Sequence, residues 1–267
     1  MKSYKVRAGQ PARIDRADPA DTSGFEGDKD AGLRRLEKLT ARLEELQELL
    51  YADHQQALLI VLQGMDSAGK DGTIRRVFSG VNPEGVRVAS FKLPSTLESE
   101  HDFLWRVHQQ VPARGEIVLF NRSHYEDVLI TRVHGLISKS TWERRYREIN
   151  EFERTLTEEG TTFLKFFLHI SRGEQKRRLK ERLDDPTKHW KFRESDIQER
   201  RLWPAYMEAY EEALTKTSTT WAPWYIIPSD RKWLRDLLVS EEIVRTLEGF
   251  RMHYPPLPPE LRAARVR

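Results

Sequence analysis

A glycine-rich stretch, GMDSAGKDG at residues 64–72, combines residue types that bind phosphate groups. Gly64, Gly69 and Lys70 fit the pattern G-x-x-x-x-G-K, in which backbone N–H groups and the lysine attract phosphate. The stretch follows an apolar run and precedes a helical pattern, which is the context that the motif requires. The sequence therefore predicts a phosphate-binding loop with these contact residues: Gly64, Met65, Ser67, Ala68, Gly69, Lys70, Asp71, Gly72 and Thr73.

The residue that usually holds a magnesium ion in this motif is a Ser or Thr after the lysine, and here it is Asp71. Thr73 comes two positions late and should point elsewhere on the helix. Asp66 lies inside the loop, where its charge would repel a phosphate unless a divalent cation lies between them. We therefore expect Asp66 to act through a metal; the alternative is that it caps the turn by a backbone hydrogen bond.

A second group of polar residues follows the apolar run IVLF: Asn121, Arg122, Glu126 and Asp127. Because the carboxyl ends of parallel strands meet at one edge of a sheet, we expect these residues across from the glycine-rich loop. Arg122 can bind a phosphate through two hydrogen bonds. Asp127, together with the loop aspartate, is predicted to hold magnesium. The alternative for Glu126 and Asp127 is a favourable charge at a helix N-terminus.

The elements that must position these residues alternate between apolar runs and amphipathic stretches. Strands are predicted at 57–63, 85–91, 116–123, 161–171 and 224–229. Helices are predicted at 32–50, 72–81, 95–111, about 124–133, 140–159, 173–183, 195–214 and 232–250. This alternation predicts an α/β fold of three layers, with a parallel sheet of about five strands covered by helices on both faces. The helix at 32–50 packs on its own domain or, as the alternative, on a partner subunit.

The composition of the chain limits which classes of protein remain possible. The 267 residues are interpreted as one domain, with an extended or mobile segment at 1–30 and an irregular, proline-rich tail at 255–267. No apolar run approaches the roughly 18 residues of a membrane span, and the N-terminus lacks a signal-peptide pattern. The absence of cysteine excludes disulfides and thiolate catalysis, and a cytoplasmic location is expected. The net charge of only +3 and the lack of a reading motif argue against nucleic-acid binding.

Four ordered blocks carry a family resemblance: GMDSAGKDGTI, FNRSHYEDVLITRVHGL, ERLDDPTKHWKF and TSTTWAPWYIIPSD. Together they resemble the polyphosphate kinase 2 family from about residue 30 to residue 250. The resemblance implies a P-loop kinase fold similar to thymidylate kinase and phosphoryl transfer between inorganic polyphosphate and nucleotides. It also implies a requirement for Mg²⁺, with Mn²⁺ as a substitute, and functional roles for Asp66, Lys70 and Asp127.

The block HYEDVLITRVHG, which contains Glu126, resembles the subclass that accepts both nucleoside mono- and diphosphates. The expected substrates are therefore polyphosphate with AMP and ADP, and guanine nucleotides are an alternative to adenine. The resemblance also implies a homo-oligomer, with a tetramer expected.

Many cations crowd the region of about 173–215, between the fourth and fifth predicted strands. In this fold the region would form a helical lid that closes over phosphates and excludes water; the alternative is a solvated helix face. The resemblance implies that Arg178 faces phosphate, and Arg182 lies one turn further along. Lys92, at the end of the second predicted strand, is another phosphate-binding candidate, and a surface lysine is its alternative.

The predicted chemistry is alignment of donor and acceptor, with charge neutralised by Mg²⁺, Lys70, Arg122 and Arg178. An acceptor phosphate is already ionised near neutral pH, so Asp66 is not assigned as a general base. Two rival functions remain. One is an ATP-dependent nucleoside or nucleotide kinase of the thymidylate-kinase type. The other is a non-catalytic polyanion-binding regulator, against which the carboxylates of Asp66 and Asp127 argue.

Overall fold

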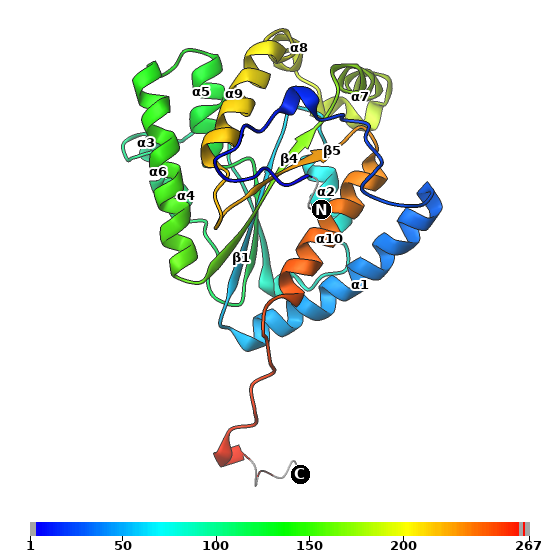
Figure 1. Ribbon diagram of the computed structural model, residues 1–267, viewed down its shortest axis with the longest axis vertical. Coiled ribbons are helices and arrows are strands. Elements are labelled where there is room, and N and C mark those ends of the chain that lie inside the picture. The colour runs from blue at the N-terminus through cyan, green and yellow to red at the C-terminus, as the bar shows by residue number, and fades with distance from the viewer. Residues whose placement is uncertain (1–3, 262–263, 265–267) are drawn as a thin grey trace.

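A parallel sheet forms the centre of the structure, a computed structural model that describes residues 4–261 and 264 (Figure 1). The strands are β1 (Ala57–Gln63), β2 (Val86–Ser90), β3 (Ile117–Asn121), β4 (Thr161–His169) and β5 (Trp224–Pro228). Their order across the sheet is β2-β3-β1-β4-β5. In the register, Val61 of β1 lies between Phe120 of β3 and Lys165 of β4. The predicted α/β fold with about five parallel strands is confirmed.

Helices lie on both faces of this sheet. They are α1 (Lys29–Asp53), α2 (Lys70–Val77), α3 (Thr96–Ser99), α4 (Trp105–His108), α5 (Ile130–Val133), α6 (Lys139–Glu158), α7 (Arg172–Asp184), α8 (Glu194–Arg201), α9 (Trp203–Thr217) and α10 (Lys232–Glu248). Short 3₁₀ turns are η2 (Ile14–Arg16), η3 (Pro83–Gly85), η4 (His124–Val128), η5 (Pro186–Lys191) and η6 (Pro259–Leu261).

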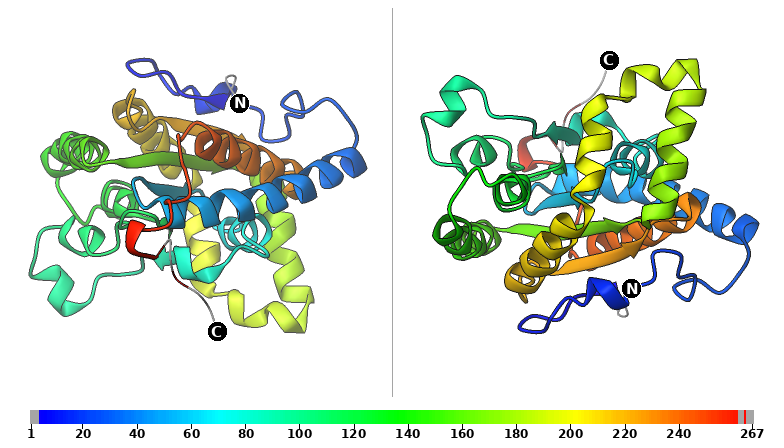
Figure 2. Two further views of the ribbon diagram at one scale, coloured as in Figure 1. Left: turned by 90° about the horizontal axis from the view of Figure 1, so that it is seen from below. Right: turned by 90° about the horizontal axis from the view of Figure 1, so that it is seen from above.

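The two helical layers follow from the alternation of side chains along each strand. In β5, Trp224 Nε1 donates to Thr217 Oγ1 of α9 at 2.9 Å. The next residue, Tyr225, donates from its hydroxyl to Glu242 Oε1 of α10 at 2.6 Å, on the other face. Helix α6 packs beside α9, whereas α1 and α2 pack against α10 (Figures 1 and 2). Five leucines of α1, Leu36, Leu39, Leu43, Leu46 and Leu50, are thus buried within this domain, as expected.

Three predicted helices are interrupted in the structure. The predicted helix 95–111 forms only α3 and α4, because Asp102 Oδ1 accepts from Leu104 N at 2.9 Å and makes a separate turn. Ser95 caps α3 as expected, accepting from Glu98 N at 3.2 Å. The predicted helix 195–214 divides into α8 and α9 at Leu202, since Pro204 has no N–H to continue α8. The predicted helix at about 124–133 divides into η4 and α5.

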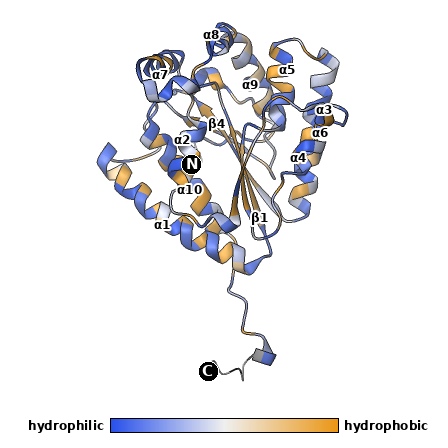
Figure 3. Ribbon diagram, turned by 180° about the vertical axis from the view of Figure 1, so that it is seen from behind, coloured by the Kyte–Doolittle hydropathy of each residue, from blue (hydrophilic) through white to orange (hydrophobic). Residues whose placement is uncertain are grey.

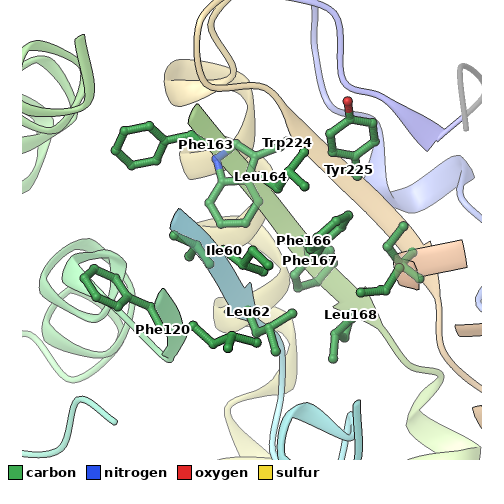
Figure 4. Close-up of a cluster of buried hydrophobic side chains, with 14 of the residues drawn as sticks. Ile60, Leu62, Phe120, Phe163, Leu164, Phe166, Phe167, Leu168, Trp224 and Tyr225 are labelled. Carbon is green, nitrogen blue, oxygen red and sulfur yellow. The ribbon is translucent and has the colours of Figure 1, made fainter. Parts of the chain in front are cut away.

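The hydrophobic core lies along the sheet. Every side chain of β1 and β5 is buried, and aromatic rings from β3, β4 and β5 pack over β1 (Figure 4). The strands are mostly apolar in Figure 3, whereas each long helix carries both apolar and polar residues. Among the described residues, no helix is long and apolar enough to cross a membrane.

A buried ionic cluster interrupts this core on the α6 side of the sheet. Lys165 Nζ of β4 donates to Glu153 Oε2 of α6 at 2.5 Å and to Thr217 O at 2.8 Å. The other oxygen of Glu153 accepts from Tyr125 OH at 2.8 Å and lies 3.3 Å from His124 Nε2. Because Tyr125 and His124 belong to η4, the cluster fixes the turn that follows β3.

The segment before α1 packs against the outer edge of β5 (Figure 2). Lys5 forms an antiparallel bridge with Tyr225, and Val6 and Ile14 are buried. This differs from the predicted extended or mobile segment at 1–30, because two apolar side chains and an edge strand offer it a docking surface; residues 1–3 lie outside the described residues. In the tail, residues 251–258 have no regular structure and η6 follows, while residues 262–263 and 265–267 lie outside the described residues.

Candidate active site

The predicted phosphate loop joins β1 to α2. Lys70, the first residue of α2, is buried and donates from Nζ to Gly64 O at 2.7 Å. Burial is the main cause that lowers the pKa of Lys70 to about 8. Gly69 has φ +113°, and a Cβ there would lie 1.8 Å from the guanidinium of Arg235. The loop therefore requires glycine at position 69 for both its backbone conformation and its space.

Two buried arginines hold the backbone of the loop from outside. Arg235 of α10 donates to Ala68 O at 3.1 Å. Arg178 of α7 is 6% exposed, and its guanidinium donates only to protein acceptors. Its partners, at 2.6 to 3.1 Å, are Glu174 and the backbone carbonyls of Ser67, Ala68, Ser229 and Asp230. The structure thus places Arg178 as a support of the loop, and the phosphate contact that the family resemblance implies for it stays a prediction.

The loop aspartate and the residues after β3 come together as expected. Arg122 Nη2 donates to Asp66 Oδ1 at 2.8 Å, and its Nη1 donates to Glu126 Oε2 at 3.2 Å. Arg122 has φ 63°, a left-handed conformation that is uncommon for a residue with a side chain. Burial lowers the pKa of Arg122, but the charges of Glu126 and Asp66 outweigh it and raise that pKa. This arrangement keeps a fixed positive charge beside the loop.

Two other predicted site residues form hydrogen bonds with side chains of the protein itself. Asn121 Nδ2 donates to Asp71 Oδ1 at 2.6 Å, so this pair links the end of β3 to α2. Thr73 is 1% exposed, and its hydroxyl donates to Asp236 Oδ1 at 3.1 Å. Thr73 points away from the loop, as its position on α2 predicted, and its predicted phosphate contact is not supported by this geometry.

The carboxylate of Asp127 contacts a different pair of arginines. Its carboxylate is 3.5 Å from Arg106 Nη2 and 3.6 Å from Arg145 Nη1. Burial raises the pKa of Asp127, although both arginines act against it. Within the described part of the chain, Asp127 Oδ2 is buried and makes no hydrogen bond, and its nearest cation is Arg106 at 3.5 Å. A buried carboxylate oxygen of this kind can accept from water or bind a metal ion.

The other residues of the loop can contact a ligand mainly through their backbone N–H groups. The side chains of Met65 and Ala68 are buried, so neither points freely to solvent. Ser67 has φ 67°, and its buried Oγ has no partner among the described residues. Gly72 is half-buried in α2. Main-chain N–H groups of this loop, with the hydroxyl of Ser67, are the groups left for a ligand.

The region predicted as a lid forms α7, η5, α8 and α9. Gln175 of α7 donates to Asp66 O at 3.0 Å and accepts from Arg200 of α8 at 2.7 Å. Glu199 of α8 lies 2.9 Å from His134 Nε2, which follows α5. These contacts join the lid to the loop on one side and to the segment after β3 on the other.

Two predicted cations lie outside this constellation. Arg182 donates to Lys191 O at 3.2 Å and is 3.6 Å from Asp196, so it joins parts of the lid. The side chain of Lys92 is exposed, and its carbonyl accepts from Arg106 at 2.8 Å. In this structure the side chain of Lys92 therefore fits its alternative interpretation, a surface lysine.

Sequence reasoning missed the arginines that support the site: Arg106, Arg145 and Arg235. Arg106 and Arg235 are at most 7% exposed, although each stands in an otherwise apolar helical pattern. A charge at a core position of an amphipathic helix was the available signal, because buried arginines must be paired. Arg145 gave no such signal, since α6 carries many arginines on its surface.

The donors present are compatible with a divalent metal ion bound together with phosphate. Among the described residues no group of three or more His, Asp and Glu side chains is arranged to hold a metal. Magnesium, however, commonly uses one or two carboxylates, with water and substrate phosphates as its other ligands. Asp66, which is 27% exposed in the loop, and Asp127, whose Oδ2 makes no hydrogen bond in the described chain, can each supply one carboxylate oxygen.

Comparisons with known proteins agree with this architecture. The family model described as polyphosphate kinase 2 matches residues 26–254. The chain is 60% identical to the AMP/ADP-polyphosphate phosphotransferase of Meiothermus ruber over 96% of both chains. It is 44% identical to the ADP-polyphosphate phosphotransferase of Rhodopseudomonas palustris, over 98% of this chain and 95% of that one.

A solved structure extends the agreement to the whole fold. The crystal structure of polyphosphate kinase 2 from Arthrobacter aurescens TC1 superposes with a TM-score of 0.93 at 45% identity. The match covers 96% of this chain and 91% of that one. With a family model over most of the chain and relatives of this identity, the protein belongs to the polyphosphate kinase 2 family.

Proposed function

We propose that this enzyme transfers the terminal phosphoryl group of inorganic polyphosphate to AMP and to ADP, reversibly and with Mg²⁺. The observation that carries the proposal is the intact glycine-rich loop with its Lys70, in a chain 60% identical to an AMP/ADP-polyphosphate phosphotransferase. The donor and product are both phosphoanhydrides, so the direction follows their concentrations.

Each group of the site has a role in phosphoryl transfer that follows from its position. Backbone N–H groups of the loop and Lys70 bind the phosphates near the N-terminus of α2. Arg122, which its contact with Asp66 holds beside the loop, neutralises charge that develops on the transferred group. Arg178 keeps the carbonyls of the loop turned away from the ligand, since it donates to two of them.

Asp66 and Asp127 are the residues that would hold Mg²⁺. Kinase-type phosphoryl transfer generally uses a divalent cation, which would here neutralise the charge of the phosphate groups. Mn²⁺ also prefers oxygen ligands and should substitute. No general base is assigned, because the acceptor phosphate is ionised near neutral pH.

Three further properties are part of the proposal. The acceptor base is adenine, with guanine tested beside it. The enzyme works in the cytoplasm, for which the absence of cysteine is the support. It assembles as a homo-oligomer with a tetramer expected, which light scattering of the purified protein tests.

Product analysis by anion-exchange chromatography tests the function. The protein is incubated with Mg²⁺, long-chain polyphosphate and either AMP or ADP, beside Asp66→Asn and Asp127→Asn variants. ADP and then ATP should form from AMP, and both variants should lose activity. ATP from ADP alone would limit the acceptor to diphosphates. Turnover with ATP but not with polyphosphate as donor would identify an ordinary nucleotide kinase.

A further inference from the structure

A cavity of about 880 Å³ lies away from the glycine-rich loop, between the N-terminal segment and the outer edge of β5. Residues from Tyr4 to Asp21 line one side, and Ile226 and Pro228 of β5 line the other. Figure 2 shows this segment running outside the sheet, beyond β5. The volume is within the range of small-molecule sites, and no step of the proposed reaction uses it.

Cations gather around this cavity: Lys5, Arg7, Arg13 and Arg16. Within residues 4–261 and 264, none of these side chains forms an ion pair or donates a hydrogen bond to a protein group. Some surface arginines elsewhere are paired, as Arg144 is with Glu148 and Arg154 with Glu158, each at 2.8 Å. The cations of the cavity thus remain available for an external anion.

The acidic groups nearby already have partners. Asp21 accepts from Tyr4 OH at 2.8 Å, and Asp18 accepts from Ala20 N at 2.8 Å. Glu211 of α9 accepts from the backbone N–H groups of Arg13 and Ile14 at 2.7 and 2.6 Å, which anchors the segment. The four cations therefore outnumber the two carboxylates of the lining.

One buried polar atom of the lining lacks a partner. His169, the last residue of β4, is 7% exposed, and its Nε2 lies 3.1 Å from Ala17 O. Nε2 is then the donor, and Nδ1 is an acceptor without a partner in the described chain. Such an atom is commonly satisfied by water, because an ionised phosphate oxygen is itself an acceptor and does not satisfy it.

A short series of hydrogen bonds connects this cavity to the glycine-rich loop. His169 O accepts from Ser229 N at 2.9 Å, and Ser229 O accepts from Arg178 at 2.6 Å. Arg178 in turn donates to Ser67 O in the loop at 2.9 Å. Strands β1 and β5 flank β4, so their separation is two inter-strand spacings, or about 10 Å. The loop follows β1 and the cavity borders β5, and a long, flexible polyanion is longer than the spacing between these two strands.

We propose that this cavity is an accessory site for phosphate groups of the polyphosphate chain, outside the segment that reacts at the loop. The proposal rests on the proposed use of polyphosphate as substrate. A chain held at two places has a higher effective concentration at the loop, and a chain too short to span them gains nothing. Long chains should therefore have a lower KM than short ones through Arg7 and Arg16.

The test uses the full chain and an Arg7→Gln/Arg16→Gln variant, which leaves the left-handed Arg13 in place. Initial rates of ATP formation from ADP are measured with a short oligophosphate and with long-chain polyphosphate. The variant should raise KM for the long chain about five-fold, with kcat and the KM for the short chain unchanged. An Arg144→Gln/Arg154→Gln variant, with the same charge change on α6, should leave all three values unchanged.

A second variant makes the cavity more positive and should change KM in the opposite direction. Asp18→Asn removes a negative charge from the lining but keeps an acceptor for Ala20 N, so it should lower KM for the long chain. Equal KM values for Arg7→Gln/Arg16→Gln and wild type with long chains would overturn the proposal. So would a raised KM for ADP at every chain length, which would assign the cavity to nucleotide, or a changed oligomeric mass. Failure of wild type to use polyphosphate would instead overturn the proposed function.

Discussion

Arg122 and Asp66 form a direct ion pair, 2.8 Å between Nη2 and Oδ1, that joins the end of β3 to the glycine-rich loop. The other terminal nitrogen of Arg122 reaches Glu126 at 3.2 Å. One planar cation thus holds two carboxylates from different parts of the chain. Its position depends on the left-handed backbone at Arg122.

Arg122→Lys tests whether this bridge is needed for catalysis. Lysine keeps the charge but lacks the planar fork that contacts both acids. We expect kcat/KM to fall roughly 10- to 100-fold, because the loop and the turn after β3 lose their common anchor. Steady-state kinetics with polyphosphate and ADP measure the effect. Arg144→Lys, in an exposed pair on α6, is the control, and equal rates for both variants would remove Arg122 from the mechanism.

Arg178→Gln tests the support of the loop. The change leaves several buried carbonyls without donors, so we expect the free energy of unfolding to fall by about 3 kcal/mol. Its neighbour Arg177 is half-exposed, and Arg177→Gln should change stability by about 0.5 kcal/mol or less. Urea denaturation followed by tryptophan fluorescence compares the two. If both variants were equally stable, the contacts of Arg178 with Ser67 and Ala68 would not hold the loop.

The buried Lys165–Glu153 ion pair predicts how the free energy of unfolding changes when one charge or both charges are removed. Lys165→Met alone leaves the carboxylate of Glu153 buried beside His124 and Tyr125, and should reduce the free energy of unfolding by about 3 to 5 kcal/mol. Lys165→Met combined with Glu153→Leu removes both charges and should recover most of that loss. The measurement is a double-mutant cycle in urea. Additive losses would show that the two charges do not depend on each other.

The lowered pKa of Lys70 predicts a pH dependence of phosphate binding. The folded-state pKa is about 8 and the ordinary value is 10.5. Between these values the folded protein carries a neutral Lys70 while the unfolded chain stays charged, so this group makes stability rise with pH. Binding behaves oppositely, since phosphate prefers the charged amine.

The KM for polyphosphate should therefore increase as pH rises above about 8, and binding there should take up a proton. Kinetics from below pH 7 to above pH 9, with calorimetry in buffers of different ionisation enthalpy, measure both effects. Lys165 has a similarly lowered pKa but lies in the core, so Lys165→Met/Glu153→Leu is the control that should keep this pH profile. A flat profile in wild type contradicts the role given to Lys70.

Local patterns explain why the strands and the loop were predictable. The apolar run before Gly64 can only be a buried strand, and the two glycines and Lys70 then fix a phosphate loop. The grouping of Asp66, Arg122 and Glu126 followed from the meeting of strand ends at one edge of a parallel sheet.

Contacts between distant residues explain what was not predictable. No local pattern shows that Arg178 turns toward the carbonyls of Ser67 and Ala68, because its partners are more than 100 positions away. The break between α3 and α4 depends on a single side-chain turn at Asp102, which an amphipathic pattern does not reveal. The docking of the N-terminal segment depends on Val6 and an edge strand near the other end of the chain.

That docking has a consequence for the order of events during synthesis. Ser218 Oγ donates to Val6 O across 212 positions of the chain. At the usual rate of protein synthesis, roughly 10 to 40 s pass between the synthesis of Val6 and that of its binding surface on β5. After β4 has been synthesised and before β5 follows, β4 is the outermost strand, and its apolar run TTFLKFFLH has a free edge that can pair with another nascent chain. Pairing of β5 with β4 covers this edge, and the N-terminal segment then packs on the outer edge of β5.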